Sequence, residues 1–284
     1  MTAGALVANC IPLVTTELLM LRPGDAGYPQ RLQALGCTRE LHVRGNLAVV
    51  QGAAPAVAIV GARAATAAAM QRAHAIARHL ANRGAHVVSG GALGIDGAAH
   101  RGVLAGEGAG QTIVVLGSGV DVAYPSRHAQ LFEEIVARGG LLVSMFPLGM
   151  KPRRGTFLQR NELIAALADV VVVVEAQVKS GSLSTAAHAR NLGRPIGATP
   201  VSPGCNRLVA GGAALVETGE DVVKILEGNP RHPARVNLDE DARRVRDALA
   251  CGVTGIDSIV RVTGLSVRAV LRALPQLESL ARSQ

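Results

Sequence analysis

Asp96 and His100 are the first residues of this sequence whose types and spacing could do chemistry. A spacing of four places two side chains on one face of a helix, where a carboxylate and an imidazole could act as a base and its partner. We favour a simpler interpretation, in which Asp96 braces the preceding loop and His100 is its structural neighbour. The sequence shows no nucleophile with a paired base and no metal-ligand spacing. We therefore expect no catalytic residue, no metal and no cofactor.

This pair lies in a glycine-rich segment, VVSGGALGIDGAAHRG, at residues 87–102. Comparable turns follow other apolar runs, at 61–63, 117–119 and 180–182. Glycine lets a main-chain N–H approach an oxyanion, and a helix that follows adds unsatisfied donors and partial positive charge. Such turns meet at the carboxyl edge of a parallel sheet, although tight packing alone explains many single glycine turns. The sequence predicts a phosphate-binding crevice at this edge. Its predicted members are Arg63, Ser89, Gly90, Gly91, Ser180 and Gly181.

A basic segment, GMKPRRGTFLQRNELIA, occupies residues 149–165. Four cations precede its first acidic residue, Glu162, and they surround Phe157. Cations for phosphates and a ring for a base are what a single-strand site needs. The alternative is a solvated loop with Phe157 in the core. We favour the binding role, because four neighbouring cations repel one another without an anionic partner. The predicted contacts are Lys151, Arg153, Arg154, Phe157, Arg160 and Asn161.

Alternating strands and helices must position these residues. Apolar runs predict strands within 56–63, 85–91, 111–119, 140–146 and 168–176, with weaker ones within 194–200 and 213–218. Alanine-rich helical patterns lie between them, for example at 66–83 and 183–192. Repeated units of this kind form a parallel sheet with helices on both faces, so the fold class is α/β.

Four regions are expected along the chain. Residues 1–50 form an N-terminal extension packed on the core, and residues 51–228 form the sheet domain. Residues 229–238 are a linker, because they combine two prolines with a charge-rich break. Residues 239–284 are expected to form a small helical domain that resembles a helix-turn-helix. The sequence shows no pair of strands there that could form the wing of a winged-helix domain.

The last predicted helix carries two arginines on one face, Arg268 and Arg272. They could make a weak contact with duplex DNA, although a solvated helix face is the favoured interpretation.

Composition limits the function classes. The 284 residues are 49% hydrophobic, which indicates a globular protein with a sizeable core. A formal charge of +8 makes a polyanionic partner worth testing. Four scattered cysteines indicate neither a zinc site nor a disulfide framework, which fits a reducing cytoplasm. Glu17 interrupts the apolar stretch at 6–21, and the valine run at 170–174 is too short to cross a bilayer, so we expect no membrane anchor.

The order of the motifs resembles the DprA/Smf family of bacterial DNA-processing proteins. The segments that carry this resemblance are, in order, VAIVGAR, SGGALGIDGAAHRGVL, LGSGVDVAYPSRH, SMFPLG, GTFLQRNELIAAL, VVVVEAQVKSGSLSTAAHA and GCNRLV. The similarity runs from about residue 28 to residue 227. It implies an extended Rossmann-like fold with a small C-terminal winged-helix-like domain.

The resemblance also implies a function. Members bind single-stranded DNA, form homodimers, protect incoming strands and load the RecA recombinase onto them during natural transformation. The family's strand-binding pocket corresponds here to Arg63, Gly90, Gly91, Arg154, Phe157 and Arg160.

This chain departs from the family pattern at several positions. The departures are Met145 in place of a glutamate, Leu158 in place of a proline, Glu162 in place of an arginine, and no arginine in the loop after Gly91. We expect the site to have fewer cations, so that Lys151, Arg153 and Arg154 carry more of the phosphate contact or the affinity is lower.

Two alternatives to a non-enzymatic strand binder stay open. Related sheet proteins bind and hydrolyse nucleotides, so the crevice could belong to a nucleotide-binding or nucleotide-hydrolysing Rossmann-like enzyme. Those enzymes carry a PGGxGTxxE segment, whereas this chain has SGGALGID. The other alternative is a nucleotide-sensing module whose terminal helices contact a protein partner.

Overall fold

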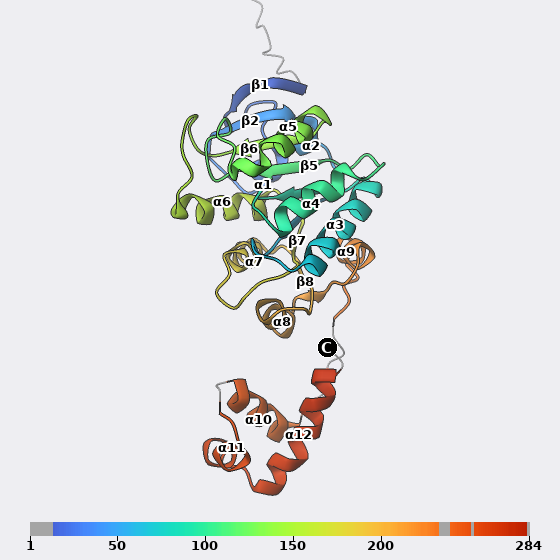
Figure 1. The fold of residues 1–284 in the computed structure, drawn as a ribbon, viewed down its shortest axis with the longest axis vertical. Helices are drawn as coiled ribbons and strands as arrows, with labels where there is room; N and C mark the ends of the chain where they lie inside the picture. Colours follow the sequence, from blue (N-terminus) through green and yellow to red (C-terminus); the bar gives the residue numbers. More distant parts are fainter. Residues whose placement is uncertain (1–13, 233–238, 251–252, 283–284) are drawn as a thin grey trace, which may run out of the picture. The chain divides into compact units, whose positions relative to one another are not determined.

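The computed structural model describes residues 14–232, 239–250 and 253–282, and the chain divides into two compact units, residues 1–231 and 232–284 (Figure 1). Within the described residues, the first unit is built on a nine-stranded sheet in the order β1-β2-β6-β5-β4-β3-β7-β8-β9. The strands are β1 Val14–Leu21, β2 Leu41–Asn46, β3 Ala56–Val60, β4 His86–Ser89, β5 Thr112–Val115, β6 Leu141–Ser144, β7 Val170–Val173, β8 Ile196–Ala198 and β9 Ala214–Leu215.

The sheet is mixed. Strands β3 to β9 pair in parallel, as the alternation of strands and helices predicted. At one edge, β1 pairs antiparallel with β2, and β2 pairs antiparallel with β6. The predicted parallel sheet is thus extended at this edge by an antiparallel pair, because part of the predicted N-terminal extension joins the sheet. Two antiparallel strands need no crossover helix, which is why the period of the core does not extend into residues 14–46.

Helices cover both faces of the sheet. They are α1 Gln30–Ala34, α2 Ala48–Gln51, α3 Ala67–Asn82, α4 Ile95–Leu104, α5 Ala129–Ala137, α6 Arg154–Ala166, α7 Ser182–Asn191, α8 Pro203–Ala210 and α9 Gly219–Leu226. In β3, Ala56, Ala58 and Val60 face the core beneath α6 and α7, whereas Val57 and Ile59 face the core beneath α3 and α4. Because alternate side chains of a strand point to opposite faces, a fully buried apolar strand such as β3 contributes to both cores.

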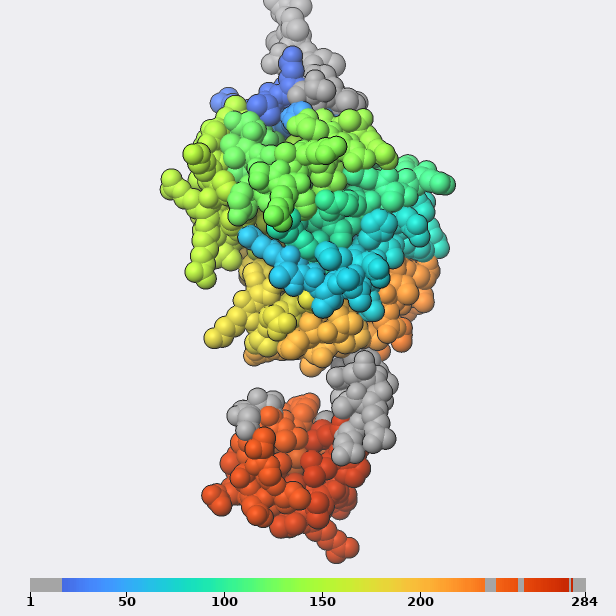
Figure 2. Space-filling model, viewed as in Figure 1, coloured from blue at the N-terminus to red at the C-terminus, as the bar shows by residue number. Residues whose placement is uncertain are grey.

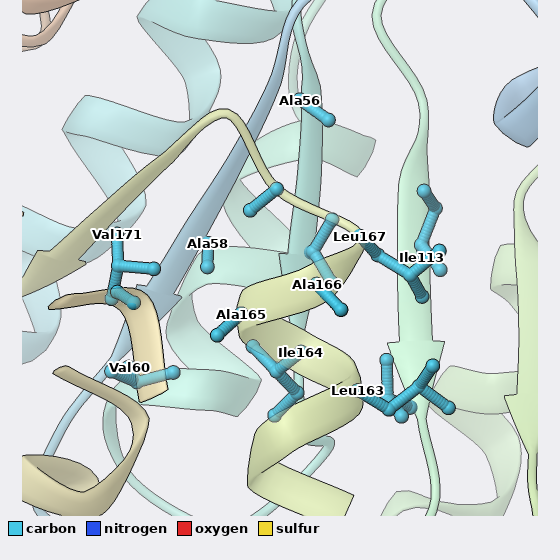
Figure 3. Close-up of a cluster of buried hydrophobic side chains, with 14 of the residues drawn as sticks. Ala56, Ala58, Val60, Ile113, Leu163, Ile164, Ala165, Ala166, Leu167 and Val171 are labelled. Atoms are coloured by element: carbon cyan, nitrogen blue, oxygen red, sulfur yellow. The ribbon is translucent and has the colours of Figure 1, made fainter. Parts of the chain in front are cut away.

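The C-terminal half of α6 is fixed to the centre of the sheet. Its residues 163–167 are buried against side chains of β3, β5 and β7, including Ala58, Ile113 and Val171 (Figure 3). A single Leu in such a position contributes about 1.5–3 kcal/mol by burial. The opposite end of the helix is thereby held at the carboxyl edge of the sheet.

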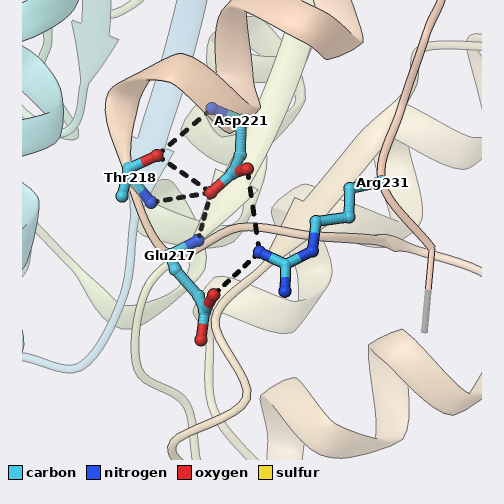
Figure 4. Close-up of polar contacts among 4 residues, drawn as sticks. All are labelled: Glu217, Thr218, Asp221 and Arg231. Carbon is cyan, nitrogen blue, oxygen red and sulfur yellow. Dashed lines mark hydrogen bonds and ion pairs between the residues drawn. The ribbon is translucent and has the colours of Figure 1, made fainter. Parts of the chain in front are cut away.

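Arg231 closes the first unit. Its carbonyl oxygen accepts a hydrogen bond from the N–H of Leu215 at 2.7 Å, and its guanidinium pairs with Glu217 at 2.8 Å. Its Nη1 also lies 4.0 Å from Asp221, whose carboxylate accepts hydrogen bonds from the main chain of Glu217 and Thr218 (Figure 4). The chain is therefore anchored up to residue 231. Of the predicted linker at 229–238, residues 233–238 lie outside the described residues.

The second unit contains three helices among its described residues, α10 Glu240–Ala250, α11 Ile256–Thr263 and α12 Val267–Arg282. They share a small core that includes Val245, Ile259 and Val270. Gly264 ends α11 in the left-handed region, at φ 68°, which is the glycine turn expected between the two helices. No strand is found in this unit among residues 239–250 and 253–282.

Cys37 and Cys205 carry free thiols, whereas Cys10 and Cys251 lie outside the described residues. None of the helices described is both long enough and apolar enough to pass through a bilayer.

Candidate nucleic-acid interface

A cavity of about 690 Å³ opens at the carboxyl edge of the sheet, between α6, α7 and the loops that follow β3, β4 and β5. β3 pairs with β4 on one side and with β7 on the other, so the chain winds away from β3 in both directions. Open α/β sheets bind their ligands at such a switch point. Figure 2 shows the segments concerned close together on one face of the first unit. The segment near residue 63 is blue, the segment near residue 120 is green, and the segment near residue 180 is yellow.

Most of the predicted contact residues line this cavity. They are Arg63, Arg153, Arg154, Phe157, Arg160, Asn161, Ser180 and Gly181. Ser89, Gly90, Gly91 and Lys151 do not line it. The lining also includes residues that the sequence analysis did not select as contacts: Tyr124, Leu158, Lys179, Ser182, Ser184 and Thr185.

The glycine turn after β4 is occupied by a carboxylate of the protein itself. Asp96 accepts hydrogen bonds from the N–H groups of Gly90 at 3.2 Å and Ala92 at 3.3 Å. The Ser89 hydroxyl donates to the carbonyl oxygen of Ile59 at 2.6 Å. The N–H groups of Gly90 and Ala92 are therefore already paired within the protein, because Asp96 reaches back from the first turn of α4. The interpretation that Asp96 braces the loop is confirmed.

His100 is a structural neighbour, as expected. It is fully buried, and its Nδ1 lies 2.7 Å from the hydroxyl of Thr112. Burial lowers the pKa of His100 to about 3, and the nearby guanidinium groups of Arg101 and Arg160 act in the same direction. The imidazole is therefore neutral at pH 7, and His100 is not among the residues that line the cavity.

The basic segment consists of a loop at residues 149–153 and the first turns of a helix. Arg153 is the residue before α6, and Arg154 opens the first turn. The N–H of Arg153 donates to the Thr156 hydroxyl oxygen at 3.1 Å, and Thr156 Oγ1 lies 2.5 Å from the carbonyl oxygen of Gly117 at the end of β5. This contact fixes the start of α6 beside the sheet edge. The predicted basic loop is therefore correct for Lys151 and Arg153, whereas Arg154, Phe157 and Arg160 lie on the helix.

Arg160 lies in the interior. Only 4% of it is exposed, and its Nη1 donates to the carbonyl oxygens of Val115 at 2.5 Å and Gly90. Gly90 must be a glycine here, because a Cβ would meet the guanidinium. Burial lowers the pKa of Arg160 to about 10, although the charge of Asp96 opposes that shift. Arg160 therefore stays charged at pH 7 and ties β4 and β5 together beneath the cavity, where we had expected a direct phosphate contact.

An aromatic and cationic cluster forms the wall of the cavity. The guanidinium carbon of Arg63 lies 4.6 Å from the ring centroid of Phe157, and the Tyr124 ring lies 5.5 Å from it at an angle of 39°. A guanidinium above an aromatic ring is attracted by its negative face. Phe157 thus holds Arg63 at the cavity mouth. Tyr124 was missed because its motif, LGSGVDVAYPSRH, was used only as a family marker.

The N-terminus of α7 faces the same cavity. Asn161 donates from Nδ2 to the carbonyl oxygen of Gly181 at 3.1 Å and to the Ser184 hydroxyl at 2.8 Å, so α6 positions the turn. The Thr185 hydroxyl is buried in the lining, and no hydrogen-bond partner is found for it among the described residues. A helix N-terminus with such a hydroxyl suits an anion.

The substitutions at 145 and 162 lie elsewhere. Glu162 pairs with Arg39 at 3.1 Å, and the Met145 sulfur lies 3.7 Å from Arg39. These three residues line a separate cavity of about 260 Å³. Glu162, which stands in place of an arginine, therefore removes no cation from the lining of the large cavity. Leu158 does line the large cavity and is half exposed.

Both candidate arginines of the second unit are exposed, and Arg272 also pairs with Asp241 at 3.1 Å. No group of three or more His, Cys, Asp or Glu side chains suited to a metal ion occurs in the described part of the chain.

Comparison with known proteins finds a family model, DNA recombination-mediator protein A, over residues 19–227, and a DprA winged helix domain over residues 229–278. A DNA processing protein DprA of Mycobacterium tuberculosis is 44% identical over 238 residues, which cover 78% of this chain and 60% of that protein. This chain thus spans less than two thirds of that relative.

Two solved structures of related proteins are similar to this chain. DNA processing protein A of Streptococcus pneumoniae matches with a TM-score of 0.67 and 35% identity, over 73% of this chain and 74% of that one. DNA processing protein A of Helicobacter pylori, described for its mode of binding single-stranded DNA, matches with a TM-score of 0.66 and 31% identity. That match covers 76% of this chain and 98% of the Helicobacter pylori chain.

Proposed function

Because the chain belongs to the DNA recombination-mediator protein A family, we propose that it binds single-stranded DNA in the large cavity and passes the strand to a recombinase. This proposal depends on one observation: exposed cations and aromatic rings line the same cavity. Those residues are Arg63, Arg153, Arg154, Lys179, Phe157 and Tyr124.

The cations of the lining are available to phosphates. Arg63, Arg153, Arg154 and Lys179 are exposed, and none makes an ion pair within 4.0 Å among residues 14–232. Like charges gathered at one cavity repel one another, and a polyanion relieves that repulsion. The N-terminus of α7 adds partial positive charge at Ser180 and Gly181. The cavity therefore favours a phosphodiester backbone.

The cavity also favours an unpaired strand. Stacking on aromatic rings requires a base with a free face, which a duplex does not offer along its length. Contacts to backbone and base faces read no base edges, so we expect little sequence preference.

The wider role follows from family membership. We propose that the protein acts in the cytoplasm as a homodimer, protects incoming strands and loads the RecA recombinase onto them during natural transformation. The second unit is proposed to make at most a weak contact with duplex DNA, through Arg268.

The site is tested by titrating a labelled oligothymidylate with wild type and Arg154→Ala. The variant should bind more weakly, and the slope of log affinity against log salt should become less negative by about 0.7 for each phosphate that the variant no longer neutralises. Arg78→Ala is a matched control, because Arg78 is an exposed arginine on α3, on the other face of the sheet. Equal binding by wild type and Arg154→Ala would remove the proposed site.

An enzymatic role has less support. The pair considered for acid–base chemistry does not meet at the cavity, because His100 is fully buried and hydrogen-bonded to Thr112. Release of a base from free nucleotides, with turnover, would restore that alternative, and calorimetry with free nucleotides would identify a sensing module.

A further inference from the structure

Phe157 offers little free surface to a ligand. On one side, a Cβ on Gly117 would lie 2.6 Å from its Cδ1, so the ring rests on the bare main chain after β5. The guanidinium of Arg63 lies 4.6 Å from its centroid, and Tyr124 covers it at 5.5 Å. Phe157 therefore supports its neighbours, and an incoming base meets Arg63 and Tyr124 first.

Tyr124 is the outer ring of this cluster. It is 42% exposed and lines the same cavity as Arg153 and Arg154. Its loop is held on both sides: the Ser118 hydroxyl donates to the carbonyl oxygen of Val122 at 2.8 Å, and the N–H of His128 donates to the carbonyl oxygen of Pro125 at 2.9 Å. A ring on a braced loop costs little conformational entropy when it binds.

We propose that Tyr124 makes this cavity prefer unpaired to paired strands, by stacking on one exposed nucleobase. The inference rests on the proposed function. Exposed cations attract the phosphates of an unpaired strand, a duplex and a backbone without bases alike. A stacking ring adds affinity only for a strand that carries bases with free faces. Tyr124 therefore sets the difference in affinity between these ligands, while the cations set the affinity that they share.

Three ligands of equal length separate these contributions: oligothymidylate, an abasic strand of the same backbone, and a duplex. Tyr124→Ala should weaken oligothymidylate binding by roughly 5- to 150-fold and leave the other two affinities unchanged. Tyr124→Phe should bind all three like wild type, because it keeps the ring. Leu148→Ala is the matched control, since Leu148 is 49% exposed and lies outside the cavity lining.

The outcomes are distinguishable. If wild type binds oligothymidylate and Tyr124→Ala binds it equally well, or binds all three ligands more weakly to the same extent while its melting temperature is retained, the role of Tyr124 is overturned and the proposed function stands. If wild type binds none of the ligands, the proposed function fails, and this inference fails with it.

Fluorescence gives an independent measurement. The chain has no tryptophan and two tyrosines, and Tyr28 is 1% exposed. Stacking of a base on Tyr124 should quench the tyrosine emission when oligothymidylate is added, and the abasic strand should leave the emission unchanged. Tyr124→Phe should remove the response while keeping the affinity. Quenching of equal size in Tyr124→Phe would contradict the assignment.

Discussion

Arg160 donates a hydrogen bond from α6 to the carbonyl oxygen of Gly90, at the end of β4. The same guanidinium nitrogen also reaches Val115, so one cation joins two neighbouring strands below the cavity. The residue that family resemblance placed in the strand-binding pocket thus lines the cavity and also holds together the loops that form it.

Replacing this cation should destabilise the first unit. Arg160→Met leaves the buried carbonyl oxygens of Gly90 and Val115 without their donor, at a cost of about 1–3 kcal/mol for each in the free energy of unfolding. Urea denaturation of the full chain measures this cost. Arg154→Met serves as the control, because Arg154 is exposed on the same helix and should change the stability little. Equal stability of the two variants would show that Arg160 does not hold the loops.

Glu162→Ala should leave the affinity for oligothymidylate unchanged. Glu162 is half exposed, pairs with Arg39 and lies outside the large cavity. Such a pair contributes about 0–1 kcal/mol to stability, so the fold should also persist. Fluorescence anisotropy at fixed salt tests this result. An affinity gain comparable in size to the decrease in Arg154→Ala would mean that the carboxylate does weaken the site.

Stability should fall as the pH decreases from about 6.5 towards 3. The pKa of His100 is about 3 in the folded state and 6.5 ordinarily. Between these two pH values the unfolded chain therefore binds a proton at His100 that the folded chain does not bind. Each pH unit within the window then removes about 1.4 kcal/mol from the free energy of unfolding. Burial also lowers the pKa of His86, which adds to the effect. His100→Gln should make the dependence shallower, as judged by urea denaturation between pH 4 and 7, and an unchanged slope would exclude His100 as its source.

In the network formed by Glu217, Thr218, Asp221 and Arg231, removing the buried Asp221 should lower the free energy of unfolding more than removing the exposed Arg231. Asp221 is 5% exposed, and Asp221→Ala leaves two main-chain N–H groups, of Glu217 and Thr218, without an acceptor, at about 1–3 kcal/mol. Arg231→Ala removes a half-exposed side chain and should cost about 0–1 kcal/mol. Thermal unfolding compares them, and the reverse order would show that the arginine dominates.

Hydropathy was enough to predict the parallel part of the sheet, because buried strands such as β7 are continuous valine runs. The edge pair could not be predicted, since the neighbour of β2 is β6, nearly one hundred residues later in the chain. Residue types also predicted much of the cavity lining, because cations and small polar residues at strand ends are local signals. They also indicated that Asp96 braces the turn after β4. They did not indicate that Arg160 would point inward, since that depends on which side chains meet across the sheet edge.

Some side chains of helix α6 pack on the sheet, and others face the cavity. Its last turn, including Leu163 and Ala165, is buried against the sheet, whereas Arg154 and Leu158 line the cavity with exposed side chains. The cavity-facing surface of α6 can therefore be varied at these two positions without touching the side chains that fix the helix to the sheet.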